Sequence, residues 1–239
     1  MRSLYVLFFV CLLISSCKEE TITANDVLEK SIAYHDPSNG WASFKGEFNV
    51  VMQTPNSSDR STSISIDLPS ASFLAIAKQD SSVVSYIINN GKCVVSAKDS
   101  VRIANLKTKP KRSHCETTTL YKDYYTYLYG LPMKLKDPGT HIDPEVTTKT
   151  FKDKEYLVIK ASYDEAVGTD VWYFYFDPVT YAMEVYQFYK TDEDGTVKPD
   201  SGEYILLTEE SVVNNIKMPK VRAWYYNKDD GYLGTDILK

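Results

Sequence analysis

Apolar and polar residues alternate one by one through long stretches of this sequence, and no other feature limits its possible folds as strongly. In one stretch, Phe48 and Val50 alternate with Glu47 and Asn49. Because successive side chains of a strand point to opposite faces, this period of two predicts a strand with one buried and one solvated face. Comparable runs occupy residues 44–53, 61–68, 73–78, 83–88, 92–95, 149–151, 156–162, 171–176, 183–190, 204–213 and 220–226. The sequence therefore predicts about eleven antiparallel strands.

Short turn signals join neighbouring runs into hairpins. Asn90-Gly91 precedes the run at 92–95 and predicts a type I′ turn. An Asp-Pro turn at 177–180 connects two further runs. The acidic segment 192–195 lacks the later bidentate acid of a calcium loop, so it is also predicted to be a turn.

Two stretches have helical spacing instead. Residues 21–36 carry one apolar stripe behind a possible cap at Thr23 or Asn25. Residues 117–129 place several tyrosines on one helical face, and Pro132 ends that helix. Such helices must bury their apolar faces on a sheet. The predicted fold class is mainly β (α+β): a curved antiparallel open β-barrel of about eleven strands wrapped round two or more helices, in a single domain of residues 23–239.

The amino terminus predicts export from the cytoplasm. Arg2 and a following apolar run make residues 1–16 a signal peptide, since the run is shorter than the ~20 residues that span a bilayer. Ile14-Ser15-Ser16-Cys17 resembles the lipobox of bacterial lipoproteins, which implies that Cys17 becomes the lipidated first residue and binds the membrane through acyl chains such as palmitate. Residues 17–22 are then a tether.

Residues 18–20 refine the expected location. Lys18-Glu19-Glu20 resembles the signal that directs lipoproteins of Bacteroidota to the outer face of the outer membrane, and implies a lipoprotein export machinery as partner. A solvated, charged tether is the alternative interpretation. We expect a lipid-anchored outer-membrane protein, on the periplasmic or the cell-surface side.

Two cysteines remain in the expected mature protein. Cys11 leaves with the signal peptide and Cys17 is acylated, so Cys93 and Cys115 remain in an oxidising compartment. They either form one disulfide or stay as thiols. No matching cluster of His or Cys accompanies them, so no metal site and no cofactor are predicted.

Two segments resemble the LolA-like family of lipoprotein-sorting and lipid-carrying half-barrels. Residues 172–183 resemble that family's strand, Asp-Pro turn and strand, and residues 215–219 resemble the turn before its final strand. The resemblance implies a concave sheet that encloses helices and a hydrophobic cavity for acyl chains. The sorting carriers are soluble, whereas this chain is expected to be anchored, so a receiver or a surface binding protein fits better.

Aromatic residues supply the candidate binding site. The chain has 19 tyrosines, and neither face of the run at 171–176 is plainly polar. One interpretation is a tyrosine-fringed pocket for an apolar ligand; the other is a helix on one face and a cavity or partner on the other. The candidate ligand-binding residues are Phe48, Trp172, Phe174, Tyr186, Phe188 and Trp224.

Catalysis and nucleic-acid binding are not predicted. The net charge is −5, and the only basic cluster, at residues 107–112, fits a solvated linker better than a headgroup site. His35, His114 and His141 are interpreted as exposed loop residues, and no catalytic motif is present. We therefore expect a non-enzymatic lipoprotein that binds a lipid or acyl chain. The alternative is a surface module that binds polysaccharide or protein through exposed aromatics; an uncharacterised hydrolase ranks third.

Overall fold

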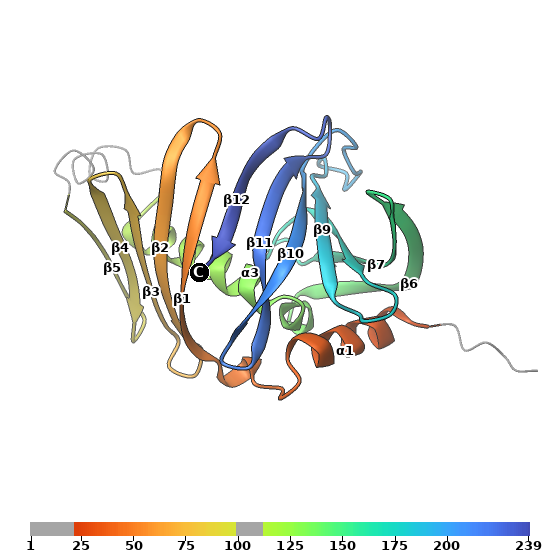
Figure 1. Cartoon of the computed structure of the whole chain (residues 1–239), viewed down its shortest axis with the longest axis horizontal. Helices are drawn as coiled ribbons and strands as arrows, with labels where there is room; N and C mark the ends of the chain where they lie inside the picture. The colour runs from red at the N-terminus through yellow and green to blue at the C-terminus, as the bar shows by residue number, and fades with distance from the viewer. Residues whose placement is uncertain (1–21, 99–111) are drawn as a thin grey trace, which may run out of the picture.

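A single antiparallel sheet of twelve strands forms the body of the protein (Figure 1). The computed structural model describes residues 22–98 and 112–239. The signal peptide, Cys17 and all but the last residue of the expected tether lie outside the described residues, as does most of the basic cluster at 107–112. The strands are β1 (Lys45–Thr54), β2 (Ser57–Asp67), β3 (Ser72–Gln79), β4 (Ser82–Asn89), β5 (Lys92–Ala97), β6 (Thr140–Phe151), β7 (Lys154–Tyr163), β8 (Val171–Phe176), β9 (Met183–Tyr189), β10 (Glu203–Val213), β11 (Ile216–Tyr226) and β12 (Tyr232–Leu238).

The strand order follows from two meanders that meet in the middle of the sheet. Strands β1 to β5 form one meander and β6 to β12 form the other. The two are joined where β1 pairs with β12, with Val50 opposite Leu238 and Gln53 opposite Thr235. Strands β5 and β6 are therefore the two edges of the sheet. The predicted open, antiparallel fold is confirmed.

Two strands differ from the sequence prediction. β12 was not predicted, because its inward positions include Gly234 and Asp236 instead of a regular series of apolar residues. β6 is longer than the three residues expected at 149–151. The prediction found only its last residues, because this edge strand is mostly exposed and lacks an apolar face. The sheet therefore has one strand more than the eleven expected.

The predicted helices are present, and both begin with a capping box. Helix α1 (Ala24–His35) starts at Thr23, whose hydroxyl accepts a hydrogen bond from the backbone N–H of Asp26. Helix α3 (His114–Gly130) is capped by Ser113 and begins three residues before the predicted start at 117. Two short 3₁₀ helices follow the long ones, η1 (Trp41–Ser43) and η2 (Met133–Lys136). In the described part of the chain, no helix is long and apolar enough to cross a membrane.

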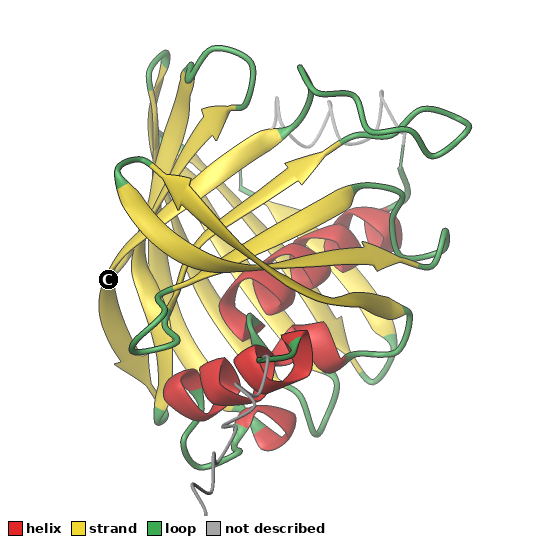
Figure 2. Ribbon diagram, turned by 90° about the vertical axis from the view of Figure 1, so that its right-hand side faces the viewer, coloured by secondary structure: helices red, strands yellow, loops and turns green. Residues whose placement is uncertain are grey.

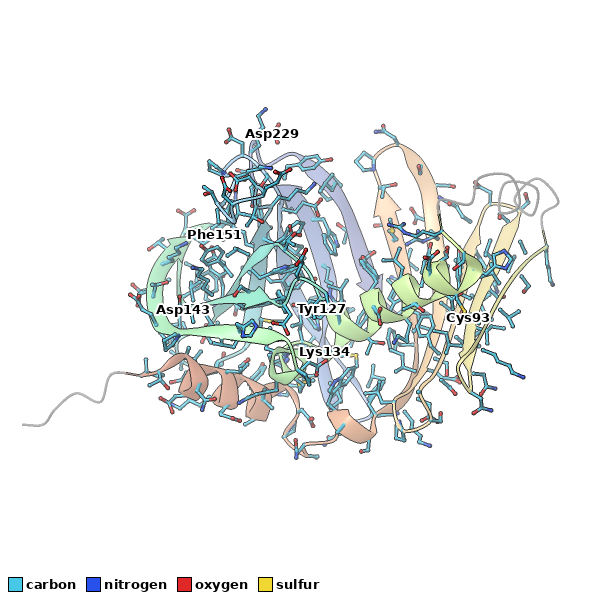
Figure 3. The ribbon with its side chains drawn as sticks, turned by 180° about the vertical axis from the view of Figure 1, so that it is seen from behind. Cys93, Tyr127, Lys134, Asp143, Phe151 and Asp229 are labelled. Atoms are coloured by element: carbon cyan, nitrogen blue, oxygen red, sulfur yellow. A yellow bond between two sulfur atoms is a disulfide. The ribbon has the colours of Figure 1, made fainter. Side chains whose placement is uncertain are left out.

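Helix α3 lies across the concave side of the sheet (Figures 2 and 3). In chain order it lies between β5 and β6, so the crossing from one edge of the sheet to the other contains this helix. A disulfide between Cys93 of β5 and Cys115 of α3 joins the first turn of the helix to one edge. Of the two states left open by the sequence, the structure has the bridged one.

The two faces of the sheet have separate apolar clusters. Phe174, Tyr186 and Ile159 contribute to the large cluster on the concave side, which also includes buried residues of α1 and α3. Val158, Tyr175 and Val185 have the opposite parity and belong to a smaller cluster on the outer face. This arrangement explains why neither face of β8 reads as polar in the sequence.

Candidate functional site

All six candidate ligand-binding residues belong to the concave cluster. Phe48, Phe174 and Tyr186 are buried there, whereas Trp172, Phe188 and Trp224 are partly buried. Trp172 is central, because its ring lies 4.8 Å from Phe188, 6.0 Å from Phe174 and 6.1 Å from Tyr186. Tyr186 in turn lies 6.2 Å from Trp224. Five of the six therefore form one continuous aromatic surface over β8, β9 and β11.

Tyrosines of α3 pack against this aromatic surface. Tyr127 lies 5.9 Å from Trp172, and Tyr124 stacks on Trp224 at 6.4 Å. The Tyr127 hydroxyl is also hydrogen-bonded to the Tyr163 hydroxyl at 2.5 Å. Phe48, the sixth candidate, is separated from the others and contacts Tyr129 of α3 at 4.6 Å. The helix thus occupies the concave side where the sequence prediction placed a ligand.

Two pockets stand out in the described part of the chain, and neither includes the six candidates. One, of about 420 Å³, lies between the start of α1, η2 and β6, and is lined by Leu28, Leu135 and Ile142 among others. The other, of about 440 Å³, lies between the end of α1 and the hairpins of β8 to β11. The aromatic surface is thus in contact with α3 and is not part of either pocket.

A row of polar side chains crosses the concave face next to the aromatic surface. Arg60 of β2 pairs with Met52 of β1, Met52 pairs with Asp236 of β12, and Asp236 pairs with Arg222 of β11. Because directly paired residues point to the same face, all four side chains face α3. Tyr124 of α3 confirms this direction, since its hydroxyl donates to Asp236 Oδ2 at 3.3 Å. We call Arg60, Met52, Asp236 and Arg222 the charged row.

Arg222 is completely buried in this row. Its Nη2 donates to the Leu128 carbonyl at 2.8 Å, and its guanidinium lies 3.8 Å from the centre of the Tyr129 ring. Leu128 is in the last turn of α3, so the cation also meets the negative end of the helix dipole. Arg222 Nε and Nη1, and the hydroxyls of Tyr129 and Tyr186, have no hydrogen-bond partner among the described residues.

Burial and the two arginines act in opposite directions on their neighbours. Burial raises the pKa of Asp236, although Arg222, Tyr124 and Arg60 each favour its ionised form. Burial also raises the pKa of Tyr129 and Tyr186 well above the ordinary value, against the opposing charge of Arg222. Both phenols therefore stay neutral and keep a proton to donate.

The sequence prediction missed the charged row, although the strand pattern contained a signal for it. Arg60 shares the parity of Ile64 and Ile66, which are apolar positions of the predicted run at 61–68 and are buried in β2. Arg222 is two residues before Trp224, a predicted inward residue of β11. Extending the alternation of each strand by two residues places both arginines on the concave side. The sequence prediction did not extend it because charged residues are seldom buried.

The prediction of exposed loop histidines is wrong for His35; for His114 and His141 the exposure is confirmed, but His114 is the first residue of α3 and His141 lies in β6. His35 is only 2% exposed, because the end of α1 packs on β9 and β11. Its Nδ1 is 2.9 Å from the Lys217 carbonyl and its Nε2 accepts from the Met183 N–H at 3.0 Å. His141 is exposed beside Asp164, and His114 is exposed at the start of α3.

Neither a free thiol nor a metal-binding cluster lies among the described residues. Cys115 is bridged to Cys93, so no thiolate is available beside His114. No group of three or more His, Cys, Asp or Glu within residues 22–98 and 112–239 is arranged to hold a metal ion. What the concave side offers is aromatic surface, one buried cation and several polar groups able to bind a ligand.

Comparison with solved structures finds matches at low sequence identity. A LolA superfamily protein from Nitrosomonas europaea matches with a TM-score of 0.50 and 9% identity over 92% of each chain. A DUF1329 family protein from Desulfovibrio piger matches with a TM-score of 0.49 and 7% identity, again over 92% of both chains. The first match confirms the LolA-like fold that residues 172–183 and 215–219 predict.

Sequence comparisons place the chain in a family. No curated protein matches it. The sequence model of one family matches residues 2–238, which is nearly the whole chain. The protein therefore belongs to the family of unknown function DUF6503.

Proposed function

We propose that this protein binds a lipid or another amphiphile with an acyl chain between helix α3 and the concave face of the sheet, without chemical transformation. The observation that carries the proposal is the continuous aromatic surface of Trp172, Phe174, Tyr186, Phe188 and Trp224, which tyrosines of α3 cover. The LolA-like fold supports it by providing a curved sheet with a helix on its concave side.

The physical basis of binding is transfer of apolar surface out of water. Each Å² of acyl chain that is buried contributes about 25 cal/mol, so one chain on an aromatic surface gains several kcal/mol. The Cys93–Cys115 bond holds the first turn of α3 against β5. We therefore infer that an acyl chain enters by displacing the tyrosines of the later turns, such as Tyr127, from Trp172.

Native mass spectrometry with lipid extraction tests the proposal on residues 18–239, which include every described residue. We expect a co-purified lipid at one per protein, and tighter binding of a fluorescent fatty acid by the parent chain than by Trp172→Ala. Tyr232→Ala is the matched control, because Tyr232 is 45% exposed and lies outside the concave cluster. Absence of both the co-purified lipid and probe binding would reject the proposal.

A second candidate function is supported by the outer face. Tyr225 stacks on Tyr204 at 5.1 Å and lies 5.5 Å from Tyr232, which is exposed. Aromatic rings of this kind also bind sugar rings and protein surfaces. In a glycan array, binding that disappears in Tyr232→Ala and persists in Trp172→Ala would favour this surface interaction module over the lipid-binding protein.

We further propose that the protein acts at the outer membrane, anchored through acyl chains on Cys17 and delivered by a lipoprotein export machinery. The support comes from the sequence of residues 1–20. Several acyl chains, at about 0.8 kcal/mol per buried CH₂, hold a protein firmly to a bilayer. An anchored binding protein would receive its ligand at the membrane surface instead of carrying it between membranes.

A further inference from the structure

The charged row carries a net positive charge on a face that is otherwise apolar. Two guanidinium groups, on Arg60 and Arg222, accompany the single carboxylate of Asp236. No ion pair joins Asp236 to either arginine among the described residues, although it pairs directly with Arg222 across the strands. Glu203, at one end of β10, is the next acid on this face; burial raises its pKa and so favours its neutral form, although Lys190 opposes that rise. One further negative charge would neutralise the row.

Hydrogen-bond donors without acceptors cluster beside Arg222. A guanidinium has five N–H donors, and the Nη2 contact with Leu128 uses one of them. Arg222 Nε and Nη1 and the hydroxyls of Tyr129 and Tyr186 have no partner among the described residues. Buried polar groups are nearly always paired, and a buried cation even more so. Donors of this number around one cation are complementary to an anionic oxygen.

We propose that Arg222, Tyr129 and Tyr186 bind the carboxylate of a fatty acid whose acyl chain lies on the aromatic surface. The inference rests on the proposed function and specifies the head group of the same ligand. We choose a carboxylate over a phosphodiester because it is the smaller anion and the cluster is fully buried, so a carboxylate has to displace the fewest side chains. The row's excess of one positive charge also matches a monoanion.

The neighbouring rings set the direction of the acyl chain. The Tyr186 ring lies 6.1 Å from Trp172, and Trp172 lies 4.8 Å from Phe188. These rings form a path from the buried Arg222 toward partly buried residues. The carboxylate is therefore bound at the buried end of the path, and the methyl end of the chain lies toward Phe188.

The decisive measurement compares hexadecanoate with hexadecanol by calorimetry on residues 18–239. The two probes share the chain and differ in the charged head. We expect the unmodified protein to bind hexadecanoate at least tenfold more tightly, because the buried cation pairs with the carboxylate. Arg222→Gln removes the charge and is expected to abolish the preference while keeping hexadecanol binding.

Tyr186→Phe keeps the inference testable if Arg222→Gln fails to fold. The Tyr186 hydroxyl donates to no acceptor among the described residues, although it lies close to Arg222, so its removal is expected to change Tm little. It should still weaken hexadecanoate binding about tenfold, because a charge-assisted hydrogen bond is lost. Tyr156→Phe is the matched control, since Tyr156 is also buried but on the outer face.

The outcomes separate the inference from the proposed function. Equal affinity for hexadecanoate and hexadecanol in the unmodified protein would overturn the carboxylate site and leave the lipid-binding proposal in place. Tighter binding of phosphatidylglycerol than of hexadecanoate would overturn the choice of a carboxylate. Binding of neither probe would reject the proposed function itself, and the carboxylate site with it.

Discussion

The ring of His35 shows how much one side chain contributes at the junction of α1 and the sheet. Its Nδ1–H donates to the Lys217 carbonyl, and its Nε2 accepts from the Met183 N–H, so the neutral ring satisfies two backbone groups. Burial is the largest cause that lowers its pKa below the ordinary value. A proton on Nε2 would remove the acceptor for Met183.

The lowered pKa of His35 predicts how stability changes with pH. In the unfolded chain the ring titrates near pH ~6.5, whereas in the fold it resists protonation. The unfolded state therefore binds more protons just below that pH. The stabilising contribution of neutral His35 is complete above pH ~6.5 and is lost as the pH falls toward the lower folded pKa. Urea unfolding between pH 8 and pH 5 measures this slope.

His35→Gln isolates this effect from the carboxylates that titrate in the same experiment. Glutamine does not titrate and leaves at least one backbone group unpaired, so we expect a loss of about 1–3 kcal/mol at pH 8. The difference in unfolding free energy between the two proteins should shrink as the pH falls. A constant difference across the range would show that His35 does not couple protonation to folding.

At this scale the sequence predicted local signals better than buried polar ones. The Thr23 cap was among the two options, and Asn90-Gly91 has the positive φ angles that a type I′ turn requires. His35 and Arg222 were assigned wrongly or missed because their burial depends on partners far away in the chain, such as Met183 and Leu128. Sequence neighbours carry no information about those partners.

Helix α3 depends on its disulfide as an element. The Cys93–Cys115 bond closes a loop with a sequence separation of 22 residues. In the chain-entropy model a loop of this length contributes about 3 kcal/mol. We expect the double variant Cys93→Ala/Cys115→Ala to lose roughly that amount of unfolding free energy in urea. Oxidised residues 18–239 should show no free thiol when denatured, and a titre of two thiols would refute the bridge.

The end of α3 tolerates no added volume. A Cβ on Gly130 would overlap the Trp41 ring and the Lys134 side chain. We expect Gly130→Ala to cost about 1–3 kcal/mol through overpacking, measured as a fall in Tm. Gly168 is the control, because a Cβ added there would have no atom within 4 Å, and Gly168→Ala should change stability by less than about 1 kcal/mol. Equal effects of the two substitutions would show that Gly130 has no packing role.

Whether a strand could be predicted from the sequence depended on whether its inward-facing residues are apolar. β1 and β2 were predicted because their buried residues are apolar, as in the pair Phe48 and Ile64. β12 was missed because Gly234 and Asp236 take two of its inward positions. Asp236 points inward and belongs to the charged row. The same aspartate therefore hid β12 from the sequence prediction and contributes to the polar site of the concave face.

For the molecule as a whole, the expected anchor determines where binding would occur. Cys17→Ala is expected to abolish metabolic labelling with a palmitate analogue and to release the protein from the membrane fraction, because acyl chains need the cysteine sulfur. Cys11→Ala is the matched control, since Cys11 lies within the expected signal peptide and should not affect labelling. Labelling that continues in Cys17→Ala would refute the lipobox assignment.

Replacing Lys18-Glu19-Glu20 with alanines tests display at the cell surface. If these residues direct the lipoprotein outward, the variant should stay at the periplasmic side and resist protease added to intact cells. The unmodified protein would be digested under the same conditions. Equal digestion of both proteins would show that this charged segment is only a solvated tether.

The overall fold class followed from the sequence because most of the twelve strands repeat the same alternating signal, so the errors at β6 and β12 do not change the architecture. The position of α3 also followed once the edges were known, since α3 lies between β5 and β6 in the chain. The pairing of β1 with β12 did not follow, because no turn joins them and their contact spans nearly the whole sequence.

That pairing sets the order in which the protein can be completed. During synthesis, β1 to β5 leave the ribosome early, but β1 acquires its second neighbour only when residues 232–238 have been made. A sheet whose two halves are joined by such a distant contact folds slowly. The chain between β1 and β12 must lose conformational entropy before the contact between these strands can stabilise the fold. Until those residues have been made, β1 keeps an unpaired edge and the two meanders cannot join into one sheet.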